Sequence, residues 1–147
     1  MKAKDKIINR VTLRFPSLSE NERFARLAVS GFVSALDPAL DELSEIKTAV
    51  SEAVTNAVVH AYPKEIGVIQ MRLRILSGDV LEIVVKDKGV GIPDVERART
   101  PLFTTGGEER SGMGFTIMEG FTDKLRVRSA PGRGTTITMR RRLLRRS

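Results

Sequence analysis

The stretch SEAVTNAVVHAY, residues 51–62, places Glu52, Asn56 and His60 four residues apart in a run of Ala, Val and Thr. An α-helix turns about 100° per residue, so steps of four keep these side chains on one face, with roughly 6 Å between neighbours. The Ala and Val residues between them supply a packing face beside this polar stripe. The stretch therefore predicts a helix at the margin of a core, where a binding pocket can form.

The sequence on either side of this stretch alternates between strand and helix patterns. IINRVTLRF, residues 7–15, alternates in a way that predicts a strand with one exposed, cationic face. After Pro16, Ser19 and Glu22 form a capping-box pattern that predicts the start of a helix. The predicted elements are a strand over 7–15, helices over 19–36 and 41–61, strands over 68–76 and 80–87, a short helix over 114–121, and strands over 124–130 and 135–144.

The segment over residues 87–114 differs from the rest because it is rich in Gly, Pro and Thr. Connections longer than about 12 residues inside a compact domain are usually lids or binding loops. The other elements predict an α/β fold, a two-layer sandwich with a mixed, mostly antiparallel sheet, helices on one face and a mobile lid. Since the 147 residues include no repeat and no low-complexity linker, we expect a single domain over residues 1–147.

The composition bears on the compartment and the partners. The chain has no Cys and no apolar run long enough for a signal peptide or a membrane span, so we expect a cytoplasmic protein without membrane contact. Its net charge of +7 favours an acidic partner, a phosphorylated ligand or nucleic acid. With one Tyr and no Trp, however, the chain offers little base stacking, and we expect no direct nucleic acid contact. The basic tail, interpreted as a solvated strand face and a frayed terminus, holds Arg140, Arg141, Arg142, Arg145 and Arg146.

Three glycine-containing motifs follow strands or open a helix. DKGVGIP, residues 87–93, begins where a strand ends, and its two glycines would let the backbone approach a flat ligand. RSGMGF, residues 110–115, would present free N–H groups at a helix start, which favours phosphate. PGRGTT, residues 131–136, indicates a hairpin turn followed by hydroxyl groups. Each motif alone is also compatible with an ordinary turn.

The order of these features is specific. A helix with Glu-x-x-x-Asn-x-x-x-His is followed by Asp-x-Gly-x-Gly after a strand, by PLFTT at residues 101–105, by ERSGMGFTIME at residues 109–119, and by Gly-Thr. In this order the chain resembles the GHKL family of ATP-binding proteins, which includes gyrase-type ATPases, Hsp90, MutL and histidine kinases. Over about residues 7–143 it is similar to the anti-sigma kinases of endospore-forming bacteria.

The resemblance implies a role for each motif residue. Glu52 would act as general base, and Arg110 would neutralise charge on the transferred phosphoryl group. Asn56 would bind Mg²⁺, whereas His60 is left outside the catalytic set. Asp87 would accept a hydrogen bond from the adenine amino group. The other residues implied to bind ATP or ADP are Gly89, Gly91, Thr104, Thr105, Ser111, Gly112, Met113, Gly114 and Thr135.

The resemblance also implies a reaction and its partners. The protein would sequester sporulation sigma factor F, and it would use ATP to phosphorylate a serine of the anti-anti-sigma factor AA. A homodimer is implied, with the strand over 7–15 in the contact. The helix over 19–36, with Glu22 and Arg26 exposed, would face the protein partners.

Other members of the wider family fit less well. A histidine kinase needs a phosphoacceptor His ahead of its ATP domain, and the one His of this chain lies within the ATP motif. Gyrase-like and MutL-like ATPases need a following domain, for which no residues remain. Two alternatives stay open: a general stress-response anti-sigma kinase, whose adenine loop usually lacks the glycine seen here as Gly91, and a nucleotide-dependent sigma-binding module without kinase activity. Glu52 favours an enzyme, since capture of a sigma factor needs no base.

Overall fold

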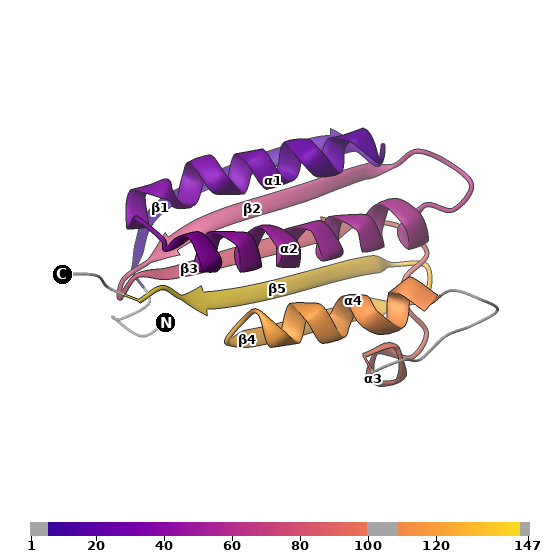
Figure 1. Ribbon diagram of the computed structural model, residues 1–147. Helices are drawn as coiled ribbons and strands as arrows, with labels where there is room; N and C mark the ends of the chain where they lie inside the picture. The colour runs from indigo at the N-terminus through magenta and orange to yellow at the C-terminus, as the bar shows by residue number, and fades with distance from the viewer. Residues whose placement is uncertain (1–5, 100–108, 145–147) are drawn as a thin grey trace.

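The computed structural model describes residues 6–99 and 109–144, with the side chains of residues 109–112 excepted. Figure 1 shows helices lying over one twisted sheet. The strands are β1 (Ile7–Pro16), β2 (Val68–Leu76), β3 (Val80–Asp87), β4 (Lys124–Ala130) and β5 (Gly134–Arg142). The helices are α1 (Glu20–Val33), η2 (Ser34–Leu36), α2 (Leu40–Asn56), η3 (Ala57–Ala61), α3 (Val95–Ala98) and α4 (Glu109–Gly120).

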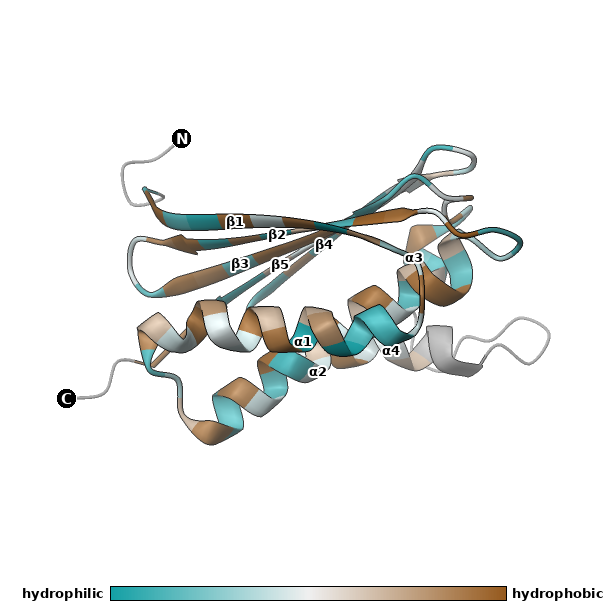
Figure 2. Ribbon diagram, turned by 90° about the horizontal axis from the view of Figure 1, so that it is seen from above, coloured by the Kyte–Doolittle hydropathy of each residue, from teal (hydrophilic) through white to brown (hydrophobic). Residues whose placement is uncertain are grey.

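The sheet has the order β1-β2-β3-β5-β4, and all four pairings between these strands are antiparallel. The predicted two-layer α/β sandwich is thus confirmed, although the sheet is antiparallel throughout the described strands rather than mixed. Figure 2 shows α1, α2 and α4 on one side of the sheet. The other side is left without a covering helix among the described elements, so the sheet has one packed face and one open face.

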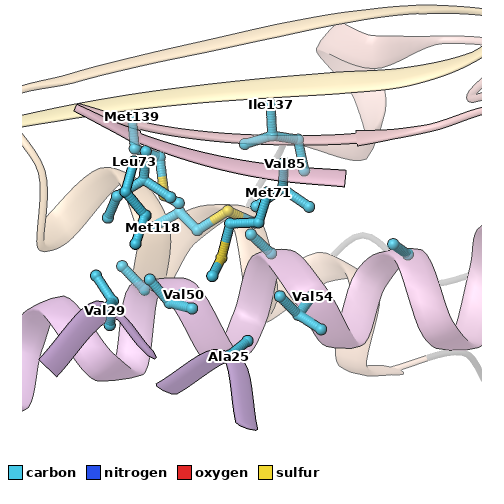
Figure 3. Close-up of a cluster of buried hydrophobic side chains, with 14 of the residues drawn as sticks. Ala25, Val29, Val50, Val54, Met71, Leu73, Val85, Met118, Ile137 and Met139 are labelled. Atoms are coloured by element: carbon cyan, nitrogen blue, oxygen red, sulfur yellow. The ribbon is translucent and has the colours of Figure 1, made fainter. Parts of the chain in front are cut away.

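The core lies between the sheet and α1, α2 and α4. Figure 3 shows Met71 and Val85 of the sheet pointing toward Val50 and Val54 of α2, with Met118 of α4 between the layers. All five side chains are nearly or fully buried. At roughly 1.5–3 kcal/mol for each fully buried aliphatic side chain, this contact fixes the polar stripe of α2 against the end of the sheet. The core therefore determines where the candidate site forms.

Three features of the helices differ from the predictions. Ser19 precedes α1 but makes no side-chain cap hydrogen bond, so the predicted capping box is wrong. A comparable interaction occurs at α2 instead, where the Glu42 carboxylate accepts a hydrogen bond from the Ala39 N–H at 2.9 Å. α4 begins at Glu109 rather than near residue 114, and the short helix α3 was not predicted. Apolar periodicity locates a helix well, but its ends depend on local hydrogen bonds.

A buried carboxylate lies at the centre of the open face. Glu82 of β3 is 2 % exposed, and its two oxygens accept hydrogen bonds from Arg74 Nε at 2.6 Å and Arg140 Nε at 2.9 Å. Burial alone would raise the pKa of Glu82, but the two arginines outweigh it and lower this pKa below its ordinary value. Glu82 is therefore ionised at neutral pH and ties β2, β3 and β5 together.

Glu82→Gln is expected to lower the free energy of unfolding by about 2 kcal/mol at pH 7, because hydrogen bonds to a charged group contribute roughly 1.5–3 kcal/mol. The lowered pKa means that this stabilisation is complete above the unfolded value of 4.5 and is lost as pH falls through the folded pKa. Urea unfolding between pH 7 and pH 3 measures the free energy of unfolding of wild type and variant. Glu65→Gln, a change at an exposed residue, is the control. A difference between Glu82→Gln and wild type that stays constant with pH would contradict this account.

Candidate functional site

The polar stripe lies on the last two turns of α2 and on the helix that continues it. Glu52 and Asn56 are half-buried and one turn apart on α2. His60 follows in η3, a π-helical segment over Ala57–Ala61. π-helical turns are rare and often occur at functional sites. The predicted helix over 41–61 is thus present but changes its hydrogen-bond pattern directly after Asn56.

The carbonyl end of η3 is joined to the loop that follows β3. The Ala61 carbonyl accepts a hydrogen bond from the Val90 N–H at 2.9 Å, which satisfies one of the carbonyl groups left free at a helix C-terminus. Gly89 passes so close that a Cβ placed on it would lie 2.1 Å from the same carbonyl oxygen. Only a residue without a side chain allows this approach, and it brings the DKGVGIP motif against the end of the polar stripe.

Asp87 lies at the end of β3, buried to 5 % exposure. Its Oδ1 accepts hydrogen bonds from the N–H groups of Gly89 at 2.9 Å and Thr135 at 3.1 Å. Burial raises the pKa of Asp87, and the two backbone hydrogen bonds only partly offset this. The carboxylate is therefore held in a fixed orientation at a desolvated position where a further hydrogen-bond donor would bind favourably.

The loop after β3 is also held to the β4–β5 hairpin. The Val90 carbonyl accepts a hydrogen bond from the Gly132 N–H at 2.7 Å. Gly91 has φ +79°, and a Cβ placed on it would lie 2.0 Å from the Ala130 carbonyl oxygen. This residue therefore needs both the conformational freedom and the small size of glycine. The end of η3 at Ala61, the loop over residues 88–92 and the β4–β5 hairpin are thus joined by hydrogen bonds, and together they are called here the wall of the candidate site.

Gly91→Ala is expected to lower the free energy of unfolding far more than Gly132→Ala. Both glycines have a positive φ, but only Gly91 is in close contact with neighbouring backbone. Gly132 has φ +76° but nothing within 4 Å of an added Cβ. Gly132→Ala should therefore lower the free energy of unfolding by about 1–2 kcal/mol, the cost of a left-handed backbone alone. Gly91→Ala adds a clash with backbone and should also lose nucleotide binding. Thermal unfolding and nucleotide titration of both variants test this, and equal effects would refute the close approach.

Helix α4 brings its own residues to the polar stripe. A Cβ placed on Gly114 would lie 3.2 Å from Glu52 Oε1, so α4 passes directly over the carboxylate. Because α4 begins at Glu109, the N–H groups that lack an intrahelical acceptor are those of its first four residues, ending at Gly112. The N–H groups of Met113 and Gly114 lie within the helix in this conformation. Gly114 contributes to the site mainly by leaving room for Glu52.

Two residues that sequence reasoning missed complete the wall. The Tyr62 hydroxyl donates to the Val68 carbonyl at 2.9 Å and accepts from the Lys88 N–H at 2.8 Å. Ser129 Oγ lies 2.7 Å from Thr135 Oγ1 and accepts a hydrogen bond from the Ile92 N–H at 2.7 Å. Tyr62 stands in the quoted HAY sequence and could have been noticed, whereas Ser129 becomes significant only through the pairing of β4 with β5.

The structure brings most of the predicted site residues to one end of the sheet. Glu52 meets Gly114, while Asp87 binds the N–H groups of Gly89 and Thr135. Thr104 and Thr105 lie outside the described residues. Arg110 and Ser111 lie on the first turn of α4, where the side chains are not described. The convergence of four segments from distant parts of the sequence is the main geometric feature of this site.

Asn56 is the predicted Mg²⁺ ligand, and its amide oxygen is a donor of the kind that this ion accepts. In the described part of the chain no group of three or more His, Cys, Asp or Glu side chains could hold a metal ion. Mg²⁺ in nucleotide sites is usually bound through one or two protein oxygens together with phosphates and water. A half-buried amide one turn from Glu52 is a donor of this kind.

Comparison with known proteins agrees with this geometry. Residues 15–141 match the histidine kinase-like ATPase domain. The chain is 55% identical over 137 residues to the anti-sigma F factor of Pasteuria penetrans, covering 92% of this chain and 91% of that one. It is 52% identical over 136 residues to the anti-sigma F factor of Geobacillus kaustophilus (strain HTA426), covering 92% and 93%. The structure of the RsbU and RsbW domains of Rv1364c from Mycobacterium tuberculosis has a TM-score of 0.70 and 20% identity, covering 95% of this chain and 34% of that one, and shows the same fold.

Proposed function

The chain belongs to the histidine kinase-like ATPase domain family and groups with the anti-sigma F factors, and on this premise we propose that it is an anti-sigma factor and an ATP-dependent serine kinase. The observation that carries the kinase activity is the position of Glu52. Its carboxylate lies beside α4, on the helix whose continuation η3 ends at Ala61 against the loop from Gly89 to Gly91. A nucleotide that spans the wall would have its base at Asp87 and its phosphates near Glu52.

The nucleotide would be oriented mainly by backbone and buried polar groups. Asp87 Oδ1 already accepts two backbone hydrogen bonds, so its other oxygen is the acceptor that remains for the adenine amino group. Thr135 and Gly91 border the same end of the site. The N–H groups at the start of α4, up to Gly112, lack an intrahelical acceptor, carry the positive end of the helix dipole and favour the phosphates.

Phosphate transfer then requires a base near the γ-phosphate. Glu52 takes the proton from a serine hydroxyl of the substrate protein, the serine oxygen bonds to the γ-phosphorus, and the bond from that phosphorus to ADP breaks. Mg²⁺ held by Asn56 and the phosphates would neutralise charge on the leaving group. Arg110, on the first turn of α4, is proposed to offset charge on the transferred phosphoryl group.

The protein partners are proposed to contact α1. Phe24 and Leu27 are 50 % and 62 % exposed and lie three positions apart on this helix, so they share one face that a partner could cover. Glu22 and Arg26, predicted to be exposed, instead form an ion pair of 2.6 Å and are partly covered. Arg26 also lines a hollow of about 370 Å³ between α1 and α2. We propose that the sigma factor F and the anti-anti-sigma factor AA bind on this side.

A homodimer and a cytoplasmic location complete the proposal. β1 is an edge strand of the sheet, and its Val11 side chain is 39 % exposed. An edge strand with unpaired backbone groups can pair with a second copy. In the described residues, no helix is both long and apolar enough to cross a membrane.

Two measurements test the proposal. Incubation with ATP labelled at the γ-phosphate, Mg²⁺ and the anti-anti-sigma factor should label one serine of that protein. Isothermal titration with the sigma factor should show binding in the presence of Mg²⁺-nucleotide. Sigma binding without any phosphate transfer would leave a binding module without kinase activity, and transfer to the anti-anti-sigma factor of the general stress response alone would favour that alternative instead.

A further inference from the structure

The strand register collects the positive charge of the chain on the open face of the sheet. Every second residue of a strand lies on the same face of the sheet, and residues paired across neighbouring strands lie side by side. Three cross-strand rows result: Lys124–Arg140–Glu82–Arg74–Arg10, Arg126–Thr138–Val84–Arg72–Thr12, and Arg128–Thr136–Lys86–Gln70–Arg14. These rows, called here the cationic face, hold nine Lys or Arg side chains and one carboxylate. The face alone therefore carries more positive charge than the net +7 of the whole chain.

The cationic face is hollowed near its centre. A hollow of about 520 Å³ is lined by Arg72, Glu82, Val84, Lys124, Leu125, Arg126, Thr138 and Arg140. Both oxygens of Glu82 are engaged by Arg74 and Arg140, and Arg72 lies 3.8 Å away. One carboxylate cannot neutralise the surrounding cations, so the hollow has a strong positive potential. It fits a ligand with several negative charges.

The composition of the face favours a protein over nucleic acid as that ligand. Seven of its nine cations are Arg, which is used in both protein and nucleic acid interfaces, so the apolar and aromatic content of the face must separate the two. Val84 adds an apolar patch within the hollow, and Val68 at the margin of β2 is 59 % exposed. None of the fifteen side chains in the three rows is aromatic, so bases would have no stacking partner.

The same charges disfavour a second copy of this chain. A two-fold interface places the same patch of both subunits together, so cationic rows would face cationic rows. Like charges opposed at an interface are strongly unfavourable. The proposed homodimer through the edge of β1 does not require such a contact, because edge pairing extends the sheet without stacking its faces.

We infer that the cationic face is a docking surface for an acidic surface of the sigma factor, separate from the contact proposed at α1. This inference rests on the proposed function, which supplies the partner. Its physical basis is the charge complementarity of an Arg-rich hollow with a partly apolar floor. Steering by such a face would mainly raise the association rate and make binding dependent on salt.

Arg72→Gln/Arg126→Gln tests the inference, because both residues line the hollow and both side chains reach solvent. The sigma factor should bind this variant about 10-fold more weakly than wild type at 50 mM KCl, and the difference should shrink at 400 mM. The control is Lys6→Gln/Lys64→Gln, which removes the same charge from two exposed residues outside the rows and outside the nucleotide site. It should bind within about 2-fold of wild type. Thermal unfolding of both variants checks that the fold is retained.

Each other outcome overturns the inference in a distinguishable way. Equal binding of both variants, with tight binding by wild type, would refute the docking surface and leave the proposed function intact. No binding of the sigma factor by wild type would instead refute the proposed function. Binding of a 20-bp DNA duplex by wild type but not by the double variant, with equal sigma factor binding by both, would assign the face to nucleic acid. A change in oligomeric state of the double variant by sedimentation would assign it to a second copy.

Discussion

Glu52→Gln is expected to lower the rate of phosphate transfer by about 10²–10⁴-fold, which is the usual contribution of a general base. The change keeps the size of the side chain and its contact with α4, where Glu52 Oε1 lies 3.2 Å from the position of a Cβ on Gly114. ATP binding should therefore stay close to that of wild type. Single-turnover transfer and nucleotide titration separate the two effects.

Glu45→Gln is the matched control for this prediction. It makes the same change on the same helix but removes an ion pair with Arg141, at 2.7 Å, that lies away from the wall of the site. Transfer should be retained in this variant. If Glu52→Gln also transfers phosphate at the wild-type rate, Glu52 is not the base; if Glu52→Gln loses nucleotide binding as well, its role is to hold the site together.

Asp87→Asn is expected to weaken nucleotide binding by about 100-fold while leaving the protein at least as stable as wild type. An amide oxygen can still accept from the N–H groups of Gly89 and Thr135. Its NH₂ group would then replace the second carboxylate oxygen and oppose the adenine amino group, donor against donor. Isothermal titration with ADP and thermal unfolding measure the two quantities.

The stability half of this prediction follows from the sign of the pKa shift. Because burial raises the pKa of Asp87 in the folded state, ionising this carboxyl at neutral pH costs folding free energy. Asparagine removes that cost. The same shift predicts that wild-type nucleotide affinity falls on acidification at a higher pH than an ordinary Asp would cause, and that the Asp87→Asn variant lacks this dependence. A variant that unfolds readily would instead show Asp87 to be a structural residue.

Local patterns account for much of what could be predicted. The strands over 68–76, 80–87 and 124–130 are confirmed at both ends, because apolar alternation and turn residues are adjacent in the sequence. The capping box at Ser19 and the start of α4 were wrong, since hydrogen bonds at helix ends depend on neighbours that the pattern does not include. The π-helical turn after Asn56 had no sequence signal.

The candidate site was predicted from motif order, but its geometry was not. Order along the chain cannot show that Asp87 binds the Thr135 N–H or that the Tyr62 hydroxyl holds the Lys88 N–H. These contacts join residues 48 and 26 positions apart. They exist because strand pairing and helix packing bring distant backbone groups together.

By itself the sequence determined the polar stripe of α2, the alternation of the strands and the residue types of the motifs, because these depend on neighbours within a few positions. The tertiary structure decided which of those residues meet. Its clearest contribution is the cationic face, where charges spread over five strands become one surface. The register that aligns them is fixed by burying the opposite face of each strand, and a shift of one residue would turn every one of these side chains into the core.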